Sequence, residues 1–525
     1  MKKKAKREWL IKWTVIFIIV SLVIMLFAGC GQKKTTVSDD SKTTVSGGNT
    51  DSKDSKSVEP KEPFEMSIYA QSYTAEPPKD DEPVLLKIQE YTNTKLNITW
   101  MTGDLEEKIS VTLASGTDLP MVMYIPNHKA AYVINAVRGG FFWEIGPYIK
   151  EFPNLSTDIG EVRFNNCSID GKIYGLPRVR PLGQNGFVYR KDWLDNLGLE
   201  VPKTIEDLYN VLKAFTFDDP DKDGKDDTYG LSQQGLGGYD VLLAAFGGPN
   251  QWEFKNGKMV PEFMTSEYMD MLNFYKKLYS EGLMNRDFAV IKGNQKYDNV
   301  NSNKAGGYFA FMSDAASKHT DLYKLEPNAK IDIIGRFSGP KGERVMASSG
   351  FAGQFMFTKR SIKDEETLKK CMNFFDKLND PEMQDLLRWG LKDRHYIVED
   401  GVYVRTNELN DLYQREVNPF RSLKLHYDEK AREGKFDYAY QRARELYVEN
   451  DNYLVLNPCE PLFSETYGER GAQLDQIIDD ASIKYIIGEI DEVGFNNALE
   501  EWRKNGGDNV IEEYTNEYLK IYQNK

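Results

Sequence analysis

Short segments with the hydrophobic patterns of strands and helices alternate from residue 64 onward. Polar and apolar side chains alternate over residues 64–70, and residues 96–100 and 121–125 also have strand-like patterns. Between these segments, residues 83–91 and 106–114 gather apolar side chains on one face of a helix. The order strand, helix, strand, helix, strand predicts a parallel sheet and a fold of the α/β class.

The N-terminus has a different pattern. An uncharged apolar run, residues 13–27, follows a start rich in lysine and arginine and precedes Ala28, Gly29 and Cys30. These features are typical of an export signal over residues 1–29. The alternative is an uncleaved membrane helix, which normally needs about 20 apolar residues and therefore more than this run contains.

Residues 30–63 are predicted to be a disordered tether. After the cysteine, valine is the only large apolar residue type among polar residues, glycine and proline. Such a stretch cannot bury enough apolar surface to offset the entropy of ordering it. A flexible tether would let the folded part stand off from a membrane surface, although a tail without any role would have the same composition.

The length and charge of the remaining chain limit what it can be. Residues 64–525 are too many for one ordinary hydrophobic core and predict two lobes. The formal charge of −14 becomes −19 when residues 1–29 are removed, because six basic residues and one glutamate leave with them. This acidity argues against a nucleic-acid partner, since binding phosphates requires clustered lysine and arginine.

Three cysteines remain when Cys30 is set aside: Cys167, Cys371 and Cys459. They are widely spaced and form no C-x-x-C pair, so the chain offers neither a zinc ribbon nor a redox motif. We expect ordinary buried thiols, with at most one disulfide.

Residues 219–227, with the sequence DPDKDGKDD, have the spacing of a calcium-binding loop. The ligands at positions 1, 3, 5, 7 and 9 would be Asp219, Asp221, Asp223, the backbone carbonyl of Lys225, and Asp227. The glutamate that completes an EF-hand loop is missing, because position 12 is Gly230. We predict a structural calcium ion at this loop, with a solvated acidic turn as the alternative.

Several phrases along the chain resemble those of one protein family. They occur in the family's order at residues 113–122 (LASGTDLPMV), 142–148, 170–177 (DGKIYGLP), 188–208 (VYRKDWLDNLGLEVPKTIEDL) and 506–514. They are similar to segments of the extracellular solute-binding proteins of ABC transporters, in particular the large oligosaccharide-binding lipoproteins of Gram-positive bacteria. Ala28, Gly29 and Cys30 likewise resemble a bacterial lipobox, whose cysteine receives a lipid and becomes the mature N-terminus.

This resemblance implies a fold and a function. The fold would be two α/β lobes with the ligand in the cleft between them and hinge closure on binding. We place lobe 1 at residues 64–182 and 305–380, and lobe 2 at residues 183–304 and 381–525. The protein would be a monomer that carries palmitate on its lipidated cysteine and is anchored to the outer face of the cell membrane. There it would capture an oligosaccharide for ABC permease subunits.

Candidate ligand-binding residues follow from the chemistry of sugar recognition, which uses aromatic faces and polar groups at the rim of a cleft. The aromatic candidates lie in loops or at predicted strand ends: Trp143, Tyr189, Trp252, Trp389 and Tyr396. Packing in the core is at least as good an account of each ring alone. Arg178 and Arg180 stand at the predicted crossing between lobes, where they could bind a uronate carboxylate or sugar hydroxyls. Solvent exposure or an ion pair between lobes is the alternative.

No catalytic motif stands out in the sequence. The histidines His128, His319, His395 and His426 show no H-E-x-x-H spacing, and neither a G-x-S-x-G elbow nor a phosphate-binding loop occurs. We therefore expect a binding protein and not an enzyme. Two alternatives stay open: a surface-anchored carbohydrate-active hydrolase, and a polysaccharide adhesion lipoprotein without a role in transport.

Overall fold

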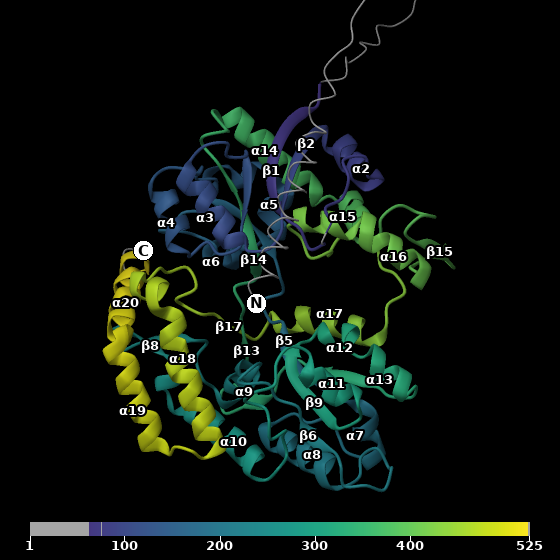
Figure 1. Cartoon of the computed structure of the whole chain (residues 1–525), viewed down its shortest axis with the longest axis vertical. Helices are drawn as coiled ribbons and strands as arrows, with labels where there is room; N and C mark the ends of the chain where they lie inside the picture. The colour runs from purple at the N-terminus through teal and green to yellow at the C-terminus, as the bar shows by residue number, and fades with distance from the viewer. Residues whose placement is uncertain (1–61, 75, 523–525) are drawn as a thin grey trace, which may run out of the picture. The chain divides into compact units, whose positions relative to one another are not determined.

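The computed structural model describes residues 62–74 and 76–522. Figure 1 shows these residues as two α/β lobes, each built around its own sheet. The predicted export signal, Cys30 and all of the predicted tether except residues 62 and 63 lie outside the described residues. None of the helices within the described residues is both long and apolar enough to cross a membrane.

Lobe 1 contains a five-stranded sheet with the order β2-β1-β3-β14-β4. Its strands are β1 (Phe64–Gln71), β2 (Thr94–Met101), β3 (Val122–Ile125), β4 (Gly175–Val179) and β14 (Phe351–Phe357). β1 runs parallel to β2 and β3, whereas β14 runs antiparallel to β3 and β4. The connecting helices α2 (Pro83–Thr92) and α3 (Leu105–Ser115) lie where the hydrophobic periodicity predicted them.

Local sequence explains these elements. Along β1, Met66, Ile68 and Ala70 are buried and the residues between them are less so, which is the period of two that a strand with one core-facing side requires. Helix α3 begins at Asp104, whose side chain accepts a hydrogen bond from the backbone N–H of Glu107.

Lobe 2 contains a four-stranded sheet with the order β10-β5-β9-β6. Its strands are β5 (Asn185–Arg190), β6 (Tyr229–Leu231), β9 (Ala305–Phe311) and β10 (Ile331–Ile334). β5 is antiparallel to both of its neighbours, and β6 is parallel to β9. Helix α8 (Ile205–Phe217) begins with a capping box, in which Thr204 and Asp207 each accept the other's backbone N–H.

The strand pairing differs from the predicted division into lobes. We expected residues 305–380 in lobe 1, but β9 and β10 pair with β5 of lobe 2. This pairing satisfies the N–H and C=O groups on both edges of β5, which burial would otherwise leave without partners. Conversely, residues 381–425 were expected in lobe 2, yet their apolar side chains pack into the core of lobe 1. The chain returns to the first sheet only at β14.

The remaining elements cover the two sheets. Those of lobe 1 are α4 (Ala131–Arg138), η1 (Gly146–Glu151), α5 (Pro153–Asp158), α6 (Glu161–Asn166), α14 (Glu365–Leu378), α15 (Pro381–Trp389), β15 (Ile397–Glu399), β16 (Val402–Val404), α16 (Asn407–Glu416) and η3 (Asn418–Leu423). Those of lobe 2 are α7 (Lys191–Leu197), α9 (Tyr239–Phe246), β7 (Trp252–Lys255), β8 (Lys258–Pro261), η2 (Glu262–Met264), α10 (Ser266–Ser280), α11 (Gln295–Asn301), α12 (Asp314–Ser317), α13 (Thr320–Leu325), β11 (Ser338–Gly339), β12 (Gly342–Glu343) and α17 (Tyr438–Asn450).

The chain passes between the lobes at residues 180–184, 347–350 and 424–437, next to the short pair β13 (Val345–Met346) and β17 (Leu454–Val455). The C-terminal elements α18 (Glu465–Ile487), α19 (Glu492–Trp502), η4 (Arg503–Gly507) and α20 (Asp508–Tyr522) follow. They join lobe 2, where α18 packs on α10 and α20 packs on β8.

The three described cysteines, Cys167, Cys371 and Cys459, are buried free thiols, which confirms that part of the prediction. Burial raises the pKa of the Cys371 thiol to about 12, so this thiol stays protonated and unreactive at neutral pH.

Candidate ligand site at the junction of the lobes

Two crossing segments run side by side where the lobes meet. The backbone N–H of Arg180 donates to the carbonyl of Gly350 at 2.8 Å, and that of Ser348 donates to the carbonyl of Leu182 at 2.8 Å. Side chains from both lobes gather around this pair of segments.

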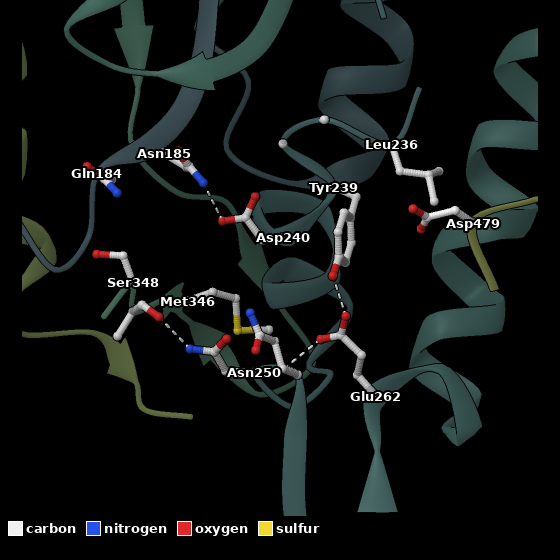
Figure 2. Close-up of a pocket in the computed structure, with 14 residues that line it drawn as sticks. Gln184, Asn185, Leu236, Tyr239, Asp240, Asn250, Glu262, Met346, Ser348 and Asp479 are labelled. Atoms are coloured by element: carbon white, nitrogen blue, oxygen red, sulfur yellow. Dashed lines mark hydrogen bonds between the residues drawn. The ribbon is translucent and has the colours of Figure 1, made fainter. Parts of the chain in front are cut away.

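A pocket of about 450 Å³ opens beside these segments and is lined mainly by polar groups of lobe 2 (Figure 2). The Asn185 amide donates to Asp240 at 2.8 Å, and the Asn250 amide donates to the carbonyl of Ala347 at 2.7 Å. We call this cavity the hinge pocket. Its amides and carboxylates can exchange hydrogen bonds with a hydroxyl-rich ligand.

A buried carboxyl group forms the far wall of the hinge pocket. Glu262 accepts hydrogen bonds from the Tyr239 hydroxyl and from the backbone N–H of Gln251. Burial raises the pKa of Glu262 to about 7, because the low-polarity surroundings disfavour the charged form. Burial raises the pKa of Asp240 as well.

A second group of side chains at the junction is cationic and aromatic. Arg178 donates to the Tyr73 hydroxyl at 2.8 Å, and its guanidinium lies 5.3 Å from the centre of the Tyr124 ring. Arg180 donates to the carbonyl of Val179 at 2.8 Å. Burial lowers the pKa of Arg180, and the neighbouring charge of Arg178 lowers it further.

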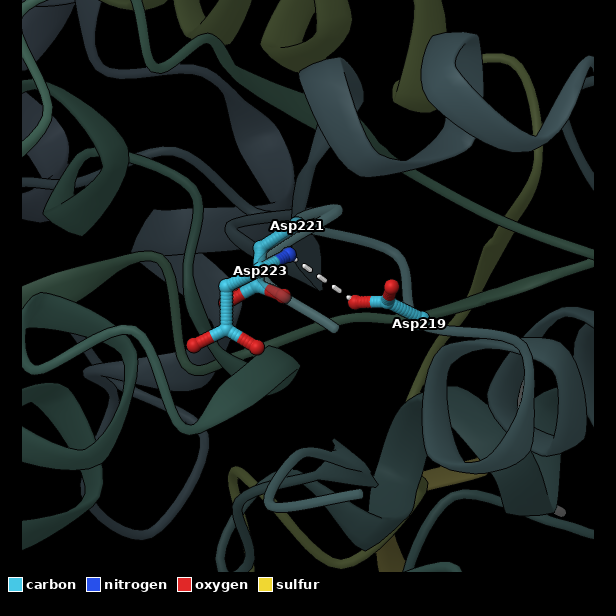
Figure 3. Close-up of side chains that lie close together, drawn as sticks. All are labelled: Asp219, Asp221 and Asp223. Carbon is cyan, nitrogen blue, oxygen red and sulfur yellow. Dashed lines mark hydrogen bonds between the residues drawn. The ribbon is translucent and has the colours of Figure 1, made fainter. Parts of the chain in front are cut away.

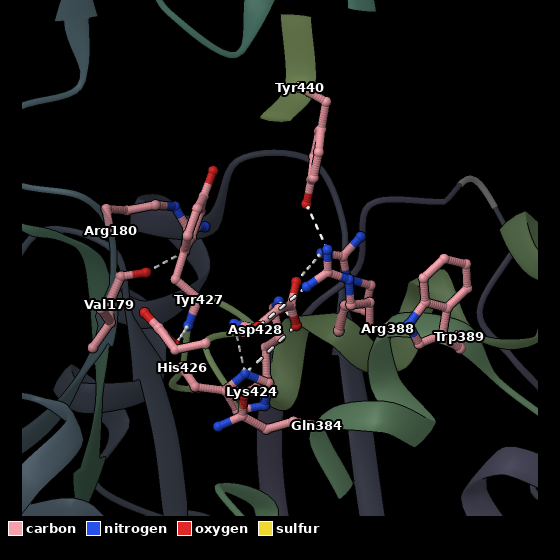
Figure 4. A network of polar contacts seen from close by, with 12 residues as sticks. Val179, Arg180, Gln384, Arg388, Trp389, Lys424, His426, Tyr427, Asp428 and Tyr440 are labelled. Atoms are coloured by element: carbon pink, nitrogen blue, oxygen red, sulfur yellow. Dashed lines mark hydrogen bonds and ion pairs between the residues drawn. The ribbon is translucent and has the colours of Figure 1, made fainter. Parts of the chain in front are cut away.

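Arg388 reaches from lobe 1 to lobe 2 (Figure 4). It lies near the C-terminal end of α15. Its guanidinium donates to the hydroxyl of Tyr440, on α17, at 3.3 Å. It also donates to the carbonyl of Asp428 at 3.2 Å, and its guanidinium lies 4.7 Å from the centre of the Phe436 ring. Arg388 is thus a polar bridge between the lobes.

Beneath this bridge lies a buried group of paired charges. The Asp428 carboxylate forms ion pairs with Lys424 at 2.7 Å and with Arg421 at 3.1 Å. Burial alone would raise the pKa of Asp428, but the charges of Lys424 and Arg421 outweigh it and lower that pKa. Burial lowers the pKa of the Lys424 amine to about 7. This group fixes the segment that carries Tyr427 at the junction.

The arginines of the junction are not paired in this way. Over residues 62–74 and 76–522, no carboxylate oxygen lies within 4.0 Å of a charged nitrogen of Arg178, Arg180 or Arg388. Arg178 and Arg388 are nevertheless buried, and Arg180 is half-buried. Desolvating a cation without an anion is unfavourable, so an arrangement of this kind marks a candidate anion-binding site.

The predicted aromatic residues do not all lie at one place. Trp389 and Tyr396 lie together, with ring centres 6.0 Å apart, in an aromatic cluster of lobe 1 where the Trp389 indole donates to the carbonyl of Arg432 at 2.9 Å. Tyr189 is buried in the core of lobe 2. Trp143 packs on the core of lobe 1 and donates to the carbonyl of Ile362 at 3.1 Å. For Tyr189 and Trp143, the packing alternative accounts for their positions.

Trp252 lies beside the hinge pocket. It helps line an adjoining cavity of about 270 Å³, and its ring meets that of Tyr514 edge-on at 5.2 Å. The residues that our sequence analysis linked to a ligand are therefore divided between the cationic side of the junction, the pockets and the cores.

Two exposed aromatic residues were missed by the sequence analysis. Tyr73 is 52% exposed and follows the end of β1, next to Arg178. Phe311 is 49% exposed at the end of β9, opposite Asn185 of the hinge pocket. The sequence pattern that could have identified them is an aromatic residue at or just beyond the end of a strand. Core residues often show the same pattern, so it does not distinguish an exposed ring from a buried one.

The acidic loop brings three of its predicted ligands together (Figure 3). Asp219, Asp221 and Asp223 each offer one oxygen, and these oxygens lie within 4.8 Å of one another. One buried carboxylate oxygen of Asp221 has no hydrogen-bond partner within the described part of the chain, and burial together with Asp223 raises the pKa of Asp221. Oxygen ligands at this spacing fit Ca²⁺. Asp227 is exposed and stands outside this group.

Comparisons with known proteins agree with this architecture. The family of bacterial extracellular solute-binding proteins matches residues 72–353. The polygalacturonan/rhamnogalacturonan-binding protein YtcQ of Bacillus subtilis (strain 168) is 39% identical over 510 residues, covering 96% of this chain and 98% of the relative. Lipoprotein LipO of the same organism is 37% identical over 534 residues, covering 100% of this chain and 99% of the relative.

A solved structure of the alginate-binding protein AlgQ2 without calcium ion has the same fold. It superposes with a TM-score of 0.61 over 87% of this chain and 98% of AlgQ2, at 17% identity. At this identity the likeness concerns the fold alone. The predicted two-lobed α/β fold is confirmed.

Proposed function

Because this chain belongs to the family of bacterial extracellular solute-binding proteins, we propose that it captures an oligosaccharide outside the membrane and delivers it to an ABC permease. One observation carries the proposal: Arg178, Arg180 and Arg388 lie at the junction of the lobes without a carboxylate partner among the described residues, and the exposed Tyr73 ring lies beside Arg178 and the partly buried Phe436 ring beside Arg388. A ligand with carboxylate groups on sugar rings would satisfy both features.

The chemistry favours uronate-containing sugars. A guanidinium group binds a carboxylate through two parallel hydrogen bonds, and the apolar face of a sugar ring packs on an aromatic ring. The relative YtcQ, a polygalacturonan/rhamnogalacturonan-binding protein, supports this ligand class. Binding would draw the lobes together around the ligand, as the contact of Arg388 with Tyr440 already does across the junction.

The family and the relative YtcQ are binding proteins. We accordingly expect capture without turnover. Purified protein should leave a bound oligosaccharide intact, and steady release of shorter products would instead support a hydrolase.

The proposed location is the outer face of the cell membrane. Cys30 would carry the lipid after removal of residues 1–29, and the similarity to the lipoprotein LipO supports this. The protein should label with palmitate in its host, and Cys30→Ser should abolish the label. Unlabelled, full-length protein in the membrane fraction would exclude the anchor.

We further propose that the acidic loop holds a structural calcium ion through Asp219, Asp221, Asp223, the carbonyl of Lys225, and Asp227. A bound cation would offset the repulsion among these carboxylates and rigidify the loop between α8 and β6. Chelation should therefore lower the melting temperature. The double variant Asp219→Ala, Asp221→Ala should lose this response, whereas Asp226→Ala, an exposed neighbour outside the ligand set, should keep it.

The test of the main proposal is calorimetric titration with linear oligomers of galacturonic acid. Arg180→Gln should bind about tenfold to a hundredfold more weakly, because a hydrogen bond to a charged group contributes about 1.5–3 kcal/mol. Arg503→Gln is the matched control, since Arg503 lies near Glu500 and Asp508 on the C-terminal helices. Equal affinity in the wild type and both variants would show that Arg180 does not contact the ligand.

A further inference from the structure

A second large groove lies on lobe 1, away from the hinge pocket. It has a volume of about 580 Å³ and runs between α2 and α15 to the hairpin of β15 and β16, elements that Figure 1 shows on one side of that lobe. Its described lining comes from lobe 1 and from Arg432 of the adjoining crossing segment, and it shares no described lining residue with the hinge pocket. We call it the lateral groove.

The lateral groove has an apolar floor. Met383, Leu386 and Leu391 lie there. Tyr396 and Tyr403 lie beside them, with their rings stacked at 4.4 Å between centres. A floor of this kind suits a short extended peptide that carries apolar side chains or proline, since proline-containing segments dock in aromatic-lined grooves.

The rim of the lateral groove carries both signs of charge. Its charged members are Lys87, Glu90, Glu382, Asp385, Lys392 and Arg432. Four of them form two pairs, Lys87 with Glu90 and Asp385 with Arg432. Within residues 62–74 and 76–522, no oppositely charged atom lies within 4.0 Å of Glu382 or Lys392. One acid and one base therefore stand ready to pair with a segment that also carries both charges.

The described part of the chain begins beside one end of this groove. The backbone N–H of Phe64 donates to the carbonyl of Asn93 at 3.0 Å. Asn93 directly follows α2, whose Tyr91 lines the groove. Residues 55–61 immediately precede the described residues and can span at most about 25 Å when fully extended. They can therefore enter the groove without any change in the folded part.

The composition of residues 55–61 fits the groove. The segment reads SKSVEPK, in which Val58 and Pro60 are apolar and the charged residues have both signs. Proline favours the extended polyproline conformation. Residues 31–54 contain no proline, so the rest of the tether lacks this feature.

Attachment to the folded part strengthens such a contact. A segment joined by a short linker to its own binding groove has an effective concentration in the millimolar range. Contacts too weak to hold a free peptide therefore suffice here, even though a polar segment gains little from burial.

We propose that residues 55–61 dock in the lateral groove, with Val58 and Pro60 on its apolar floor. Docking would shorten the free part of the tether and fix which side of lobe 1 faces the membrane. The inference concerns how the folded part is held and does not rest on the ligand proposed above.

The experiment uses bimane, a thiol-reactive fluorophore that is quenched by contact with tyrosine or tryptophan rings. The full chain with Cys30→Ser receives the label through Val58→Cys or, for comparison, through Val45→Cys. The three cysteines of the folded part are buried and stay unlabelled. Bimane at residue 58 should be quenched, and bimane at residue 45 should not.

Two further variants test where the quenching arises. Leu391→Glu places a carboxylate on the floor and should restore the emission at residue 58 to the level at residue 45, because burying that charge is unfavourable. Leu325→Glu is the matched control, since Leu325 is 56% exposed on α13 of lobe 2, and it should leave the quenching unchanged. Pro60→Gly lies outside the folded part, cannot unfold it, and should also relieve the quenching because it loosens the extended segment.

The outcomes are distinct. Equal emission at residues 58 and 45, or quenching that survives both Leu391→Glu and Pro60→Gly, would overturn the proposal. Quenching that grows with protein concentration would assign the groove to a second copy of the chain and overturn it as well. Calorimetry with galacturonate oligomers tests the ligand separately, so a failure there would leave the docking result standing.

Discussion

Two buried carboxyl groups on opposite sides of the junction behave in opposite ways. Asp428 and Glu262 are similarly buried, with 5% and 7% of their surface exposed. Asp428 faces Lys424 and Arg421, and its pKa is lowered because their charges outweigh burial. Glu262 faces a tyrosine hydroxyl and a backbone amide, and burial raises its pKa to about 7.

Because the two carboxyl groups are similarly buried, the difference in their pKa shifts comes from the charged or neutral groups that surround each of them. Around Asp428 the cations exceed the anions among the described residues, since Arg388 and Arg180 lie in the same network and no carboxylate of residues 62–74 or 76–522 pairs with them (Figure 4). Around Glu262 the pocket holds acids and amides (Figure 2). One wall therefore suits an anion, and the other suits hydroxyl groups.

The largest expected effect comes from removing the paired anion. Asp428→Ala would leave Lys424 and Arg421 buried without a counter-charge, which should lower the free energy of unfolding by about 3–5 kcal/mol. Denaturation with urea measures this change.

The matched control is Asp385→Ala. Asp385 pairs with Arg432, whose side chain is largely exposed, so its loss should cost less than about 1 kcal/mol. If Asp428→Ala were no worse than Asp385→Ala, the charge network beneath Arg388 would have no structural role.

A smaller expected effect is the contribution of Glu262 to the pH dependence of stability. Between pH 4.5 and about 7, folded Glu262 keeps a proton that the unfolded chain releases, so the folded state binds more protons and stability falls as pH rises. The stabilisation is complete below pH 4.5 and lost above about 7, and it amounts to about 3 kcal/mol. Glu262→Gln should remove this part of the pH dependence. Parallel pH profiles of the free energy of unfolding for wild type and variant would contradict the shift.

Local patterns predicted the elements of this fold better than they predicted its site. The strand at residues 64–70 depends on neighbours in sequence, so pattern alone located it. The lobe of β9 was misassigned because its partner β5 is more than a hundred residues away. Arg178 and Arg180 lie at the junction because the sequence marks that crossing, and their role in ligand binding stays a prediction. Arg388 and Tyr440 were missed, since only tertiary packing brings them together.

The smallest expected effect concerns that last contact, which joins the two lobes. Tyr440→Phe removes only the hydroxyl that accepts the hydrogen bond from Arg388, and a hydrogen bond of this kind contributes about 1 kcal/mol. Because the bond exists only when the lobes are together, its loss should weaken binding of a galacturonate oligomer about fivefold through the closing equilibrium. Tyr438→Phe is the control, since Tyr438 donates to Asp332 within lobe 2 at 3.1 Å and its loss should leave affinity unchanged. Small-angle scattering should also show a larger radius of gyration for ligand-free Tyr440→Phe than for Tyr438→Phe. Equal radii and equal affinities for the two variants would mean that Arg388 does not couple binding to closure.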